Sequence, residues 1–177
     1  MRALFFILLL VGVQGFGQPV FTSADMPAVG DRFVEYFVDT LVGTPITTGG
    51  LGANQIWDFA NLSIRNNDPI ESIYVNPALT RYANEFSNSN LCQYLRETYN
   101  YYESTVNDYG YLGSGRGGGV EIFSNSIIYF TLPFTYNSIN IDNFNGTNIF
   151  RQDTAYIFGT TKIIGDAYGT LILPSGT

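Results

Sequence analysis

The strongest constraint on the fold is the regular alternation of residue types in the second half of the chain. From Leu91 onward, short stretches rich in Tyr, Phe, Ile and Val alternate with clusters of Asn, Gly, Ser and Pro. Aromatic and β-branched residues favour strands, and the intervening types favour turns. The alternation predicts a β-meander with strands in "LCQYLRETYNYYESTV", "YGYL", "VEIFS", "SIIYFTLPF", "NSINIDNF", "TAYIFGTTKII" and "GTLILP".

The first half adds three predicted strands and one predicted helix. The strands are "RFVEYFVDT", "IWDFANL" and "IESIYV", with a predicted turn at "SIRNNDP". Large apolar side chains lie on both faces of the first strand, so we expect it to be covered, at least in part, on both sides. Apolar residues recur at helical spacing in "NPALTRYANEF", where Asn76 can cap a helix and Pro77 can begin it.

These elements predict one all-β domain over residues 18–177, either an antiparallel two-layer sandwich or a curved half-barrel, with one short helix. Aromatic residues make up 16% of the chain and charged residues only 13%. A chain this aromatic can bury a core, which excludes intrinsic disorder. Its surface must then owe its polarity mainly to Asn, Ser and Thr.

Residues 1–17, "MRALFFILLLVGVQGFG", match a secretory signal peptide. Arg2 precedes an apolar run that is too short to span a bilayer, and small residues follow it. The alternative is a buried N-terminal helix or strand. We expect export through the Sec pathway, with cleavage after Gly17 or Gly15, to a secreted or outer-membrane surface location. No later stretch has the length and hydropathy of a membrane span.

The charge of the chain argues against nucleic acid as a partner. Removing residues 1–17 leaves 7 basic against 15 acidic residues, a net charge of −8. Lys162 is the only lysine. Neutralising a phosphate backbone needs clustered basic side chains, which this chain lacks.

The residue inventory removes most catalytic chemistries. There is no histidine, which excludes serine and cysteine triads, histidine bases and zincin-type zinc sites. The single cysteine, Cys92, cannot form an internal disulfide, and its apolar neighbours favour a buried, inert thiol. We expect neither a cofactor nor a structural metal.

Carboxylates remain the only plausible catalysts, and a glycosidase would need two of them about 5 Å or 6.5–9.5 Å apart. Their spacing selects no pair, so dispersed surface carboxylates are the simpler interpretation. The candidates are Glu35, Asp58, Glu97, Glu103, Glu121, Asp142, Asp153 and Asp166.

Three further patterns are weak. Gly113, Gly115 and Gly118 match G-x-G-x-x-G, but a strand-like stretch follows instead of a helix, which favours a glycine-rich turn. Oxygen-rich residues 66–69 and 140–146 suggest calcium, but Asx-turns that need no metal are the favoured interpretation. Tyr99 and Tyr101, with Glu97 and Glu103, could form a sugar platform; packing of one tyrosine face on the core is the favoured alternative.

The stretches "TSADMPAVGDRF", "GANQIWDFANL" and "DAYGTLILPSGT" occur in this order. Together they resemble uncharacterised secreted proteins of Bacteroidota over residues 21–177. The resemblance implies an N-terminal β-rich region, followed in such proteins by another strand and a C-terminal sorting domain for type IX secretion. It brings no catalytic residues. This chain lacks the sorting segment, so we expect it to be truncated, with "GTLILP" at a sheet edge or beside a gap.

These observations favour a secreted or cell-surface module that binds or displays and is not an enzyme. A glycan or another surface component is a candidate partner. Two alternatives stay open: a glycan hydrolase that uses two carboxylates, and a half-barrel that carries apolar ligands. The strands "RFVEYFV" and "IIYFTLPF", apolar on both faces, motivate the last one.

Overall fold

The computed structural model describes residues 17–39 and 49–174, and over these ranges its regular secondary structure is almost entirely β-strand. Its two helical segments are short 3₁₀ turns, η1 (Ser23–Asp25) and η2 (Pro77–Leu79). The strands are β1 (Val20–Phe21), β2 (Arg32–Asp39), β3 (Gly52–Asp58), β4 (Ser63–Val75), β5 (Leu91–Leu95), β6 (Thr98–Ser104), β7 (Asp108–Arg116), β8 (Gly119–Thr131), β9 (Phe134–Thr135), β10 (Ile139–Phe150), β11 (Asp153–Ile164) and β12 (Ala167–Ile172).

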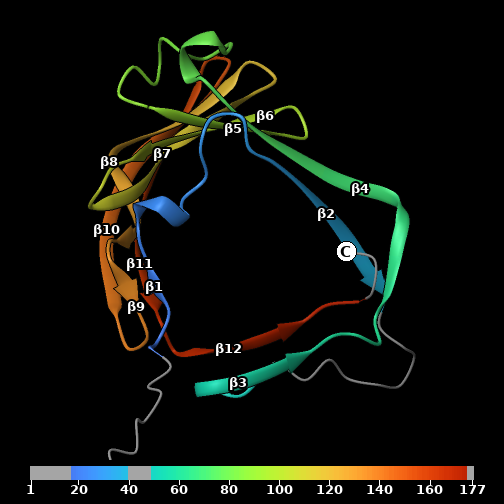
Figure 1. The fold of residues 1–177 in the computed structure, drawn as a ribbon. Helices are drawn as coiled ribbons and strands as arrows, with labels where there is room; N and C mark the ends of the chain where they lie inside the picture. Colours follow the sequence, from blue (N-terminus) through green and yellow to red (C-terminus); the bar gives the residue numbers. More distant parts are fainter. Residues whose placement is uncertain (1–16, 40–48, 175–177) are drawn as a thin grey trace, which may run out of the picture.

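One long antiparallel sheet organises the molecule. Its strand order is β11-β10-β8-β7-β6-β5-β4-β2, so most neighbours in space are also neighbours in sequence. The predicted meander is therefore confirmed, because local turns such as that at Arg96 and Glu97, both with positive φ, return each strand beside the last. In Figure 1 this sheet forms one side and the top of the molecule, and β2 and β4 continue it down the other side.

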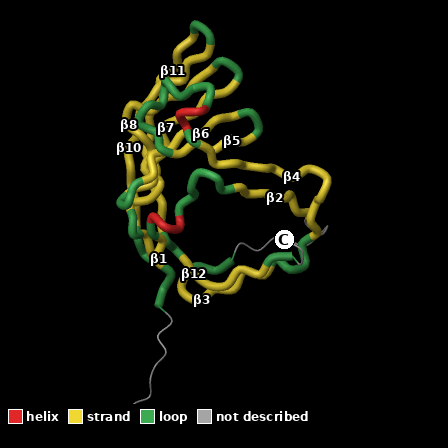
Figure 2. Tube along the Cα trace, turned by 45° about the horizontal axis from the view of Figure 1, so that its top comes forward, coloured by secondary structure: helices red, strands yellow, loops and turns green. Residues whose placement is uncertain are grey.

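Two small sheets complete the fold. β1 pairs antiparallel with β9, and β12 pairs parallel with β3. Both views place β3 and β12 opposite the top of the long sheet (Figures 1 and 2). β12 has β3 as its partner among the described strands, so the predicted edge position of "GTLILP" agrees with the structure. Whether the protein is truncated remains a prediction.

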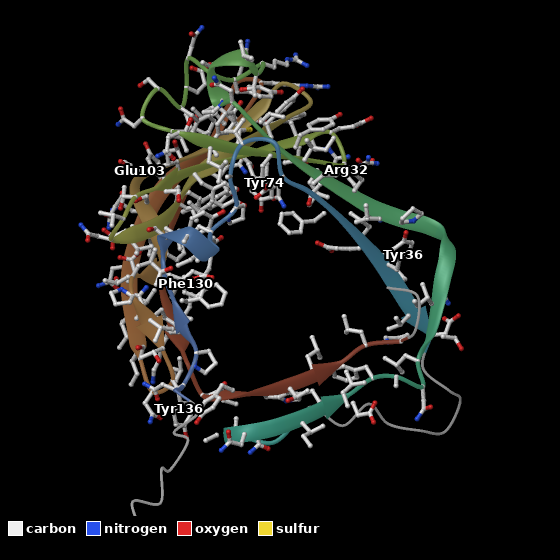
Figure 3. The ribbon with its side chains drawn as sticks, in the orientation of Figure 1. Arg32, Tyr36, Tyr74, Glu103, Phe130 and Tyr136 are labelled. Carbon is white, nitrogen blue, oxygen red and sulfur yellow. The ribbon has the colours of Figure 1, made fainter. Side chains whose placement is uncertain are left out.

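The core forms on both faces of the middle strands. On one face, residues 76–90 cover the sheet, and Tyr82 and Phe86 from this cover meet Cys92 and Tyr101. The opposite face carries a second cluster of Tyr74, Leu91 and Tyr109, with Tyr102, Tyr129 and Phe130 packed against it. Figure 3 shows Tyr74 and Phe130 on this inner side.

Three local predictions were wrong. Every residue of β2 is exposed, so β2 is not covered on both sides, although Phe33 contacts the ring of Tyr74 and Arg96 lies over Phe37. The predicted turn at 63–69 belongs to β4: residues 63–65 pair with residues 37–39 of β2, and residues 66–69 lie at the register shift before pairing resumes at Ile70. The predicted helix begins as expected, with Asn76 Oδ1 accepting from the Ala78 amide at 3.0 Å, but ends at Leu79.

The side chains after Leu79 explain why the helix stops. Tyr82 and Phe86 are buried on the sheet, but Leu79 is 86% exposed. A regular helix would place all three on one face, whereas a chain of turns lets the two aromatic rings alone reach the strands. Contact with the sheet therefore decides the backbone conformation of this segment, although its apolar residues recur at helical spacing.

Candidate functional site

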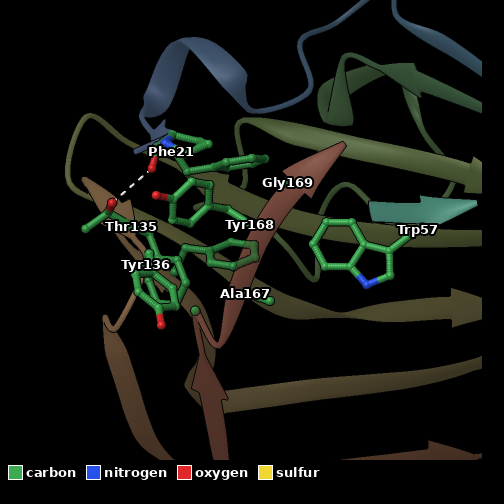
Figure 4. A pocket seen from close by; sticks show the side chains of 11 residues that line it. Phe21, Trp57, Thr135, Tyr136, Ala167, Tyr168 and Gly169 are labelled. Carbon is green, nitrogen blue, oxygen red and sulfur yellow. Dashed lines mark hydrogen bonds between the residues drawn. The ribbon is translucent and has the colours of Figure 1, made fainter. Parts of the chain in front are cut away.

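The best candidate site is a cleft of about 380 Å³ where the two small sheets meet the long one. Figure 4 shows Phe21, Tyr136 and Tyr168 gathered on one side and Trp57 on the other. We call this cleft the aromatic pocket. It is lined by Pro19, Phe21, Trp57, Phe130, Phe134, Thr135, Tyr136, Gly165, Ala167, Tyr168 and Gly169.

The N-terminal wall of the pocket is held by β1 and β9. Phe21 pairs with Phe134 in register, and the Thr135 hydroxyl donates to the Pro19 carbonyl at 2.9 Å. After Phe21 the chain turns at η1, where Asp25 accepts from the Thr22 amide at 2.8 Å. That amide and the Thr22 hydroxyl hold the pKa of Asp25 below its usual value. The capping bonds fix the direction in which β1 enters the pocket wall.

The opposite wall depends on how β12 approaches β3. The Gly52 amide donates to the Asp166 carbonyl at 2.9 Å, and the Phe59 amide donates to the Ile172 carbonyl at 2.8 Å. These bonds bracket the parallel pair and align Leu171 with Trp57. Gly169 permits the approach, because a Cβ there would collide with the backbone of Gln55. This arrangement places Trp57 opposite the N-terminal wall of the pocket.

Tyr136 and Tyr168 join the two walls. Their ring centroids lie 5.3 Å apart at an interplanar angle of 70°, an edge-to-face contact. The Asn137 amide donates to the Gly165 carbonyl at 2.7 Å, and this bond ties the turn after β9 to the turn before β12. Phe130 contacts Phe134 at 5.3 Å and Phe21 at 6.1 Å. The pocket is thus bounded by rings that support one another.

The chemistry of this lining is apolar. Six of the eleven lining residues are aromatic, and none is charged. The polar side-chain groups around it are the hydroxyls of Thr135, Tyr136 and Tyr168 and the indole N–H of Trp57. Such a cleft favours an apolar or aromatic ligand. Its lining offers no side chain that commonly serves as a general acid, a general base or a nucleophile.

The candidate carboxylates are distributed over different elements. Asp142 accepts from the Ile128 amide at 3.0 Å, Asp58 from the Ala60 amide at 3.0 Å, and Glu97 lies 3.9 Å from Arg116. Glu35 lies on β2, Glu103 on β6, Glu121 on β8, Asp153 at the start of β11 and Asp166 just before β12. In three clefts lined by described residues, Glu121 is the one candidate carboxylate, and it lines a single cleft. These three clefts thus give no support to the two-carboxylate hydrolase.

The glycine-rich stretch has a packing role. Gly113 and Gly115 lie within β7, where a Cβ at Gly113 would collide with the Glu121 carbonyl and the Phe86 ring, and a Cβ at Gly115 with the Tyr82 ring. Gly117 and Gly118, with φ of 58° and 88°, form the hairpin that leads into β8. A dinucleotide fingerprint requires a helix at this place, and the structure has a strand. The glycines of β7 leave room for the rings of Tyr82 and Phe86.

The second oxygen-rich stretch, residues 140–146, lies in β10 and not in a loop. Alternate side chains of a strand point to opposite faces, so its oxygens do not converge. Asn140 donates to the Ile128 carbonyl at 2.6 Å, and Asn143 accepts from the Thr160 hydroxyl at 2.7 Å. Among the described residues no group of three or more Asp, Glu, Cys or His forms a metal site. The side chains of 66–68 lie outside the described residues.

The tyrosine platform is contradicted and the buried thiol is confirmed. Tyr101 is fully buried and stacks on Phe86 at 4.1 Å, and its hydroxyl bonds to that of Thr80 at 2.6 Å. Tyr99 packs half-buried against the same cluster. Cys92 is fully buried beside them, and burial raises the pKa of its thiol to about 12. This face of β6 is core.

Sequence reasoning missed most of the aromatic pocket. Trp57, in a stretch predicted only as a strand, is half-buried in the pocket wall. The doubly apolar stretch "IIYFTLPF" did point to Phe130 and Phe134 as candidates for contact with an apolar ligand. Nothing in the sequence indicated that β1 would join them or that β12 would bring Trp57, since the pairings of β1 with β9 and of β12 with β3 join residues more than a hundred positions apart.

Comparisons with protein-family models, curated proteins and solved structures give no match to this chain. No described helix has the length and apolar character that crossing a membrane requires. The predicted signal peptide lies outside the described residues apart from Gly17. The aromatic pocket is therefore the feature of the chain that indicates a function.

Proposed function

We propose that this protein is an exported, non-enzymatic binding module that holds an apolar or aromatic ligand in the aromatic pocket. The observation that carries the proposal is a cleft of about 380 Å³ in which six aromatic side chains converge from β1, β3, β8, β9 with the turn after it, and β12. This volume lies within the usual range for small-molecule sites. Apolar cavities of this kind take up hydrocarbon guests because water gains few hydrogen bonds inside them.

Two further observations favour binding over catalysis. The lining residues include no carboxylate, lysine, arginine or cysteine, so a bound molecule would meet no strong general acid, base or nucleophile. The long sheet and the two small sheets position the rings before any ligand arrives, which lowers the entropic cost of binding. The export signal predicted at residues 1–17 places such a module outside the cytoplasm.

The pocket contains its own reporter, because Trp57 is the only tryptophan of the chain. We would titrate the purified protein with a medium-chain fatty acid, naphthalene and cellobiose, and follow tryptophan emission and the heat of binding. The two apolar probes should change the emission saturably, and the sugar should not. If neither apolar probe binds, the proposal fails.

A matched pair of variants locates the binding. Ala167→Phe would fill the pocket, whereas Thr170→Phe adds the same ring to an exposed position of β12 outside the lining. We expect Ala167→Phe to weaken binding of the apolar probes about tenfold or more, equivalent to about 1.4 kcal/mol. Thr170→Phe should change it less than about twofold. Equal effects of the two variants would place the ligand elsewhere.

The non-enzymatic part is tested separately with a broad glycan panel. We expect no hydrolysis. Turnover that disappears when two of the candidate carboxylates are replaced by amides would show a glycosidase and overturn this part of the proposal.

A further inference from the structure

β11 is the terminal strand of the long sheet and has an unusually open edge. It pairs with β10 through all twelve residues, Asp153–Ile164, without a register shift. No other described strand pairs with its far side. A strand in this position presents a row of unpaired backbone N–H and C=O groups, and these groups bind another strand most readily.

The opposite edge of the sheet, β2, carries features that discourage such pairing. Arg32, Glu35 and Asp39 place charges along it, and its register shifts between Glu35 and Phe37. Arg32 and Asp39 also form ion pairs with Glu71 and Arg65 on β4. Charges and bulges are the usual means by which edge strands avoid association.

β11 has almost none of these features. Between Thr154 and Ile164 it contains no proline and only one charged residue, Lys162. Tyr156 and Phe158 are each 82% exposed on one face, and on the same face of β10 Ile139 and Ile141 are 59% and 62% exposed. This edge is long, regular and apolar, which is the combination that favours pairing with another strand.

We propose that β11 pairs antiparallel with β11 of a second copy, so that the two long sheets become one continuous sheet across a two-fold axis. With the axis at Ile157, Tyr156 of each copy lies opposite Phe158 of the other, and Thr154 lies opposite Thr160. Aromatic pairs and threonine pairs in these positions stabilise antiparallel strands. The two Lys162 side chains fall at opposite ends of the interface, so like charges do not meet.

A second copy fits this edge better than the alternative contact between β11 and β2. Pairing of β11 with β2 would be heterologous and would extend into an open filament. It would also set the regular β11 against the charged, shifted edge of β2. Self-pairing through β11 pairs the open edges of both copies with each other, so the assembly is closed as a dimer.

Sedimentation velocity over a concentration series tests the proposal on the purified protein. We expect a monomer–dimer equilibrium with no larger species. The dimer should tighten as salt is added, because each copy is acidic and the interface contains no ion pair. A monomer up to high micromolar concentration, or growth into filaments, would overturn the proposal.

Charge substitutions locate the interface. The double variant Tyr156→Lys with Phe158→Lys should weaken the dimer about a hundredfold or more. The control, Leu79→Lys with Val106→Lys, adds the same charge at positions that are 86% and 73% exposed and lie outside β11, and it should leave the dimer unchanged. Equal weakening by both double variants would contradict pairing through β11.

Hydrogen exchange on the unmodified protein provides an independent readout. The outward-facing amides of β11 should become protected as the protein concentration rises, while those of β2 should not. Protection of β11 that does not depend on concentration, or protection of β2 instead, would refute the proposal even if the substituted proteins failed to fold.

Discussion

At the scale of single residues, the lack of a side chain at certain glycines is as important for packing as the side chains of their neighbours. Gly115 lies beneath the ring of Tyr82, and a Cβ at Gly115 would overlap that ring. Tyr82 in turn accepts a hydrogen bond from the Gly118 amide at 3.1 Å. The glycines of β7 and its hairpin therefore make room for the aromatic rings of residues 76–90. This packing explains the glycines, whose spacing alone matches a cofactor-binding motif.

Replacing Gly115 with alanine should destabilise the protein by about 1–3 kcal/mol, because the added methyl group overpacks the core. Chemical denaturation measures the loss. In a Tyr82→Ala background the ring is absent, so Gly115→Ala should then cost close to nothing. A full cost in both backgrounds would mean that the strain does not come from Tyr82.

At the scale of elements, residues 76–90 act as a second layer without regular secondary structure. Two anchors fix this cover: Phe86, which is 4% exposed and stacks on Tyr101, and Tyr82, which is 8% exposed. Ser89 holds the end of the cover, where its hydroxyl donates to the Phe86 carbonyl at 2.7 Å. Stability of the element should therefore depend on its aromatic anchors and not on helix propensity.

Phe86→Ala should lower the free energy of unfolding by about 3–5 kcal/mol, since it removes a buried ring and leaves a cavity. Leu79→Ala, in the same cover but 86% exposed, should change it by less than about 0.5 kcal/mol. Denaturant melts of the two variants make the comparison. Similar losses at both positions would show that the cover is stabilised as a helix.

At the scale of the whole molecule, buried tyrosines and the thiol couple stability to alkaline pH. Burial raises the pKa of Tyr74, Tyr101, Tyr102, Tyr109 and Tyr129, and that of Tyr111 to about 12. Each neutral form is favoured in the folded state. The corresponding stability is complete below the unfolded-state pKa values, near 10.0 for tyrosine and 9.0 for cysteine, and is lost as the pH rises above them.

We therefore expect the free energy of unfolding to be level from about pH 7 to 9 and to fall steeply above about pH 10. Denaturant melts across this range measure it. Phenolate absorbance should show a group of tyrosines that titrate only as the protein unfolds, and the same titration in denaturant serves as the control. Stability that rises between pH 9 and 11 would contradict this linkage.

The sequence predicted those elements whose partners lie nearby in the chain. Strands β5 to β8 follow one another through short turns, and the residues that form them are visible as aromatic stretches between Gly and Asn. Errors arose where a distant partner decided the outcome. Pairing with β2 made residues 63–65 part of a strand, and the rings of Phe86 and Tyr82 reached the sheet without the helix that their spacing predicted.

The candidate site was the least predictable feature, for a physical reason. The pairings of Phe21 with Phe134 and of Leu171 with Trp57 join residues more than a hundred positions apart. Such contacts depend on the curvature of the whole sheet and leave no periodic pattern in the chain. The sequence by itself determined an all-β, aromatic and acidic protein without histidine chemistry. Only the tertiary structure decided which aromatic residues form the core and which surround the pocket.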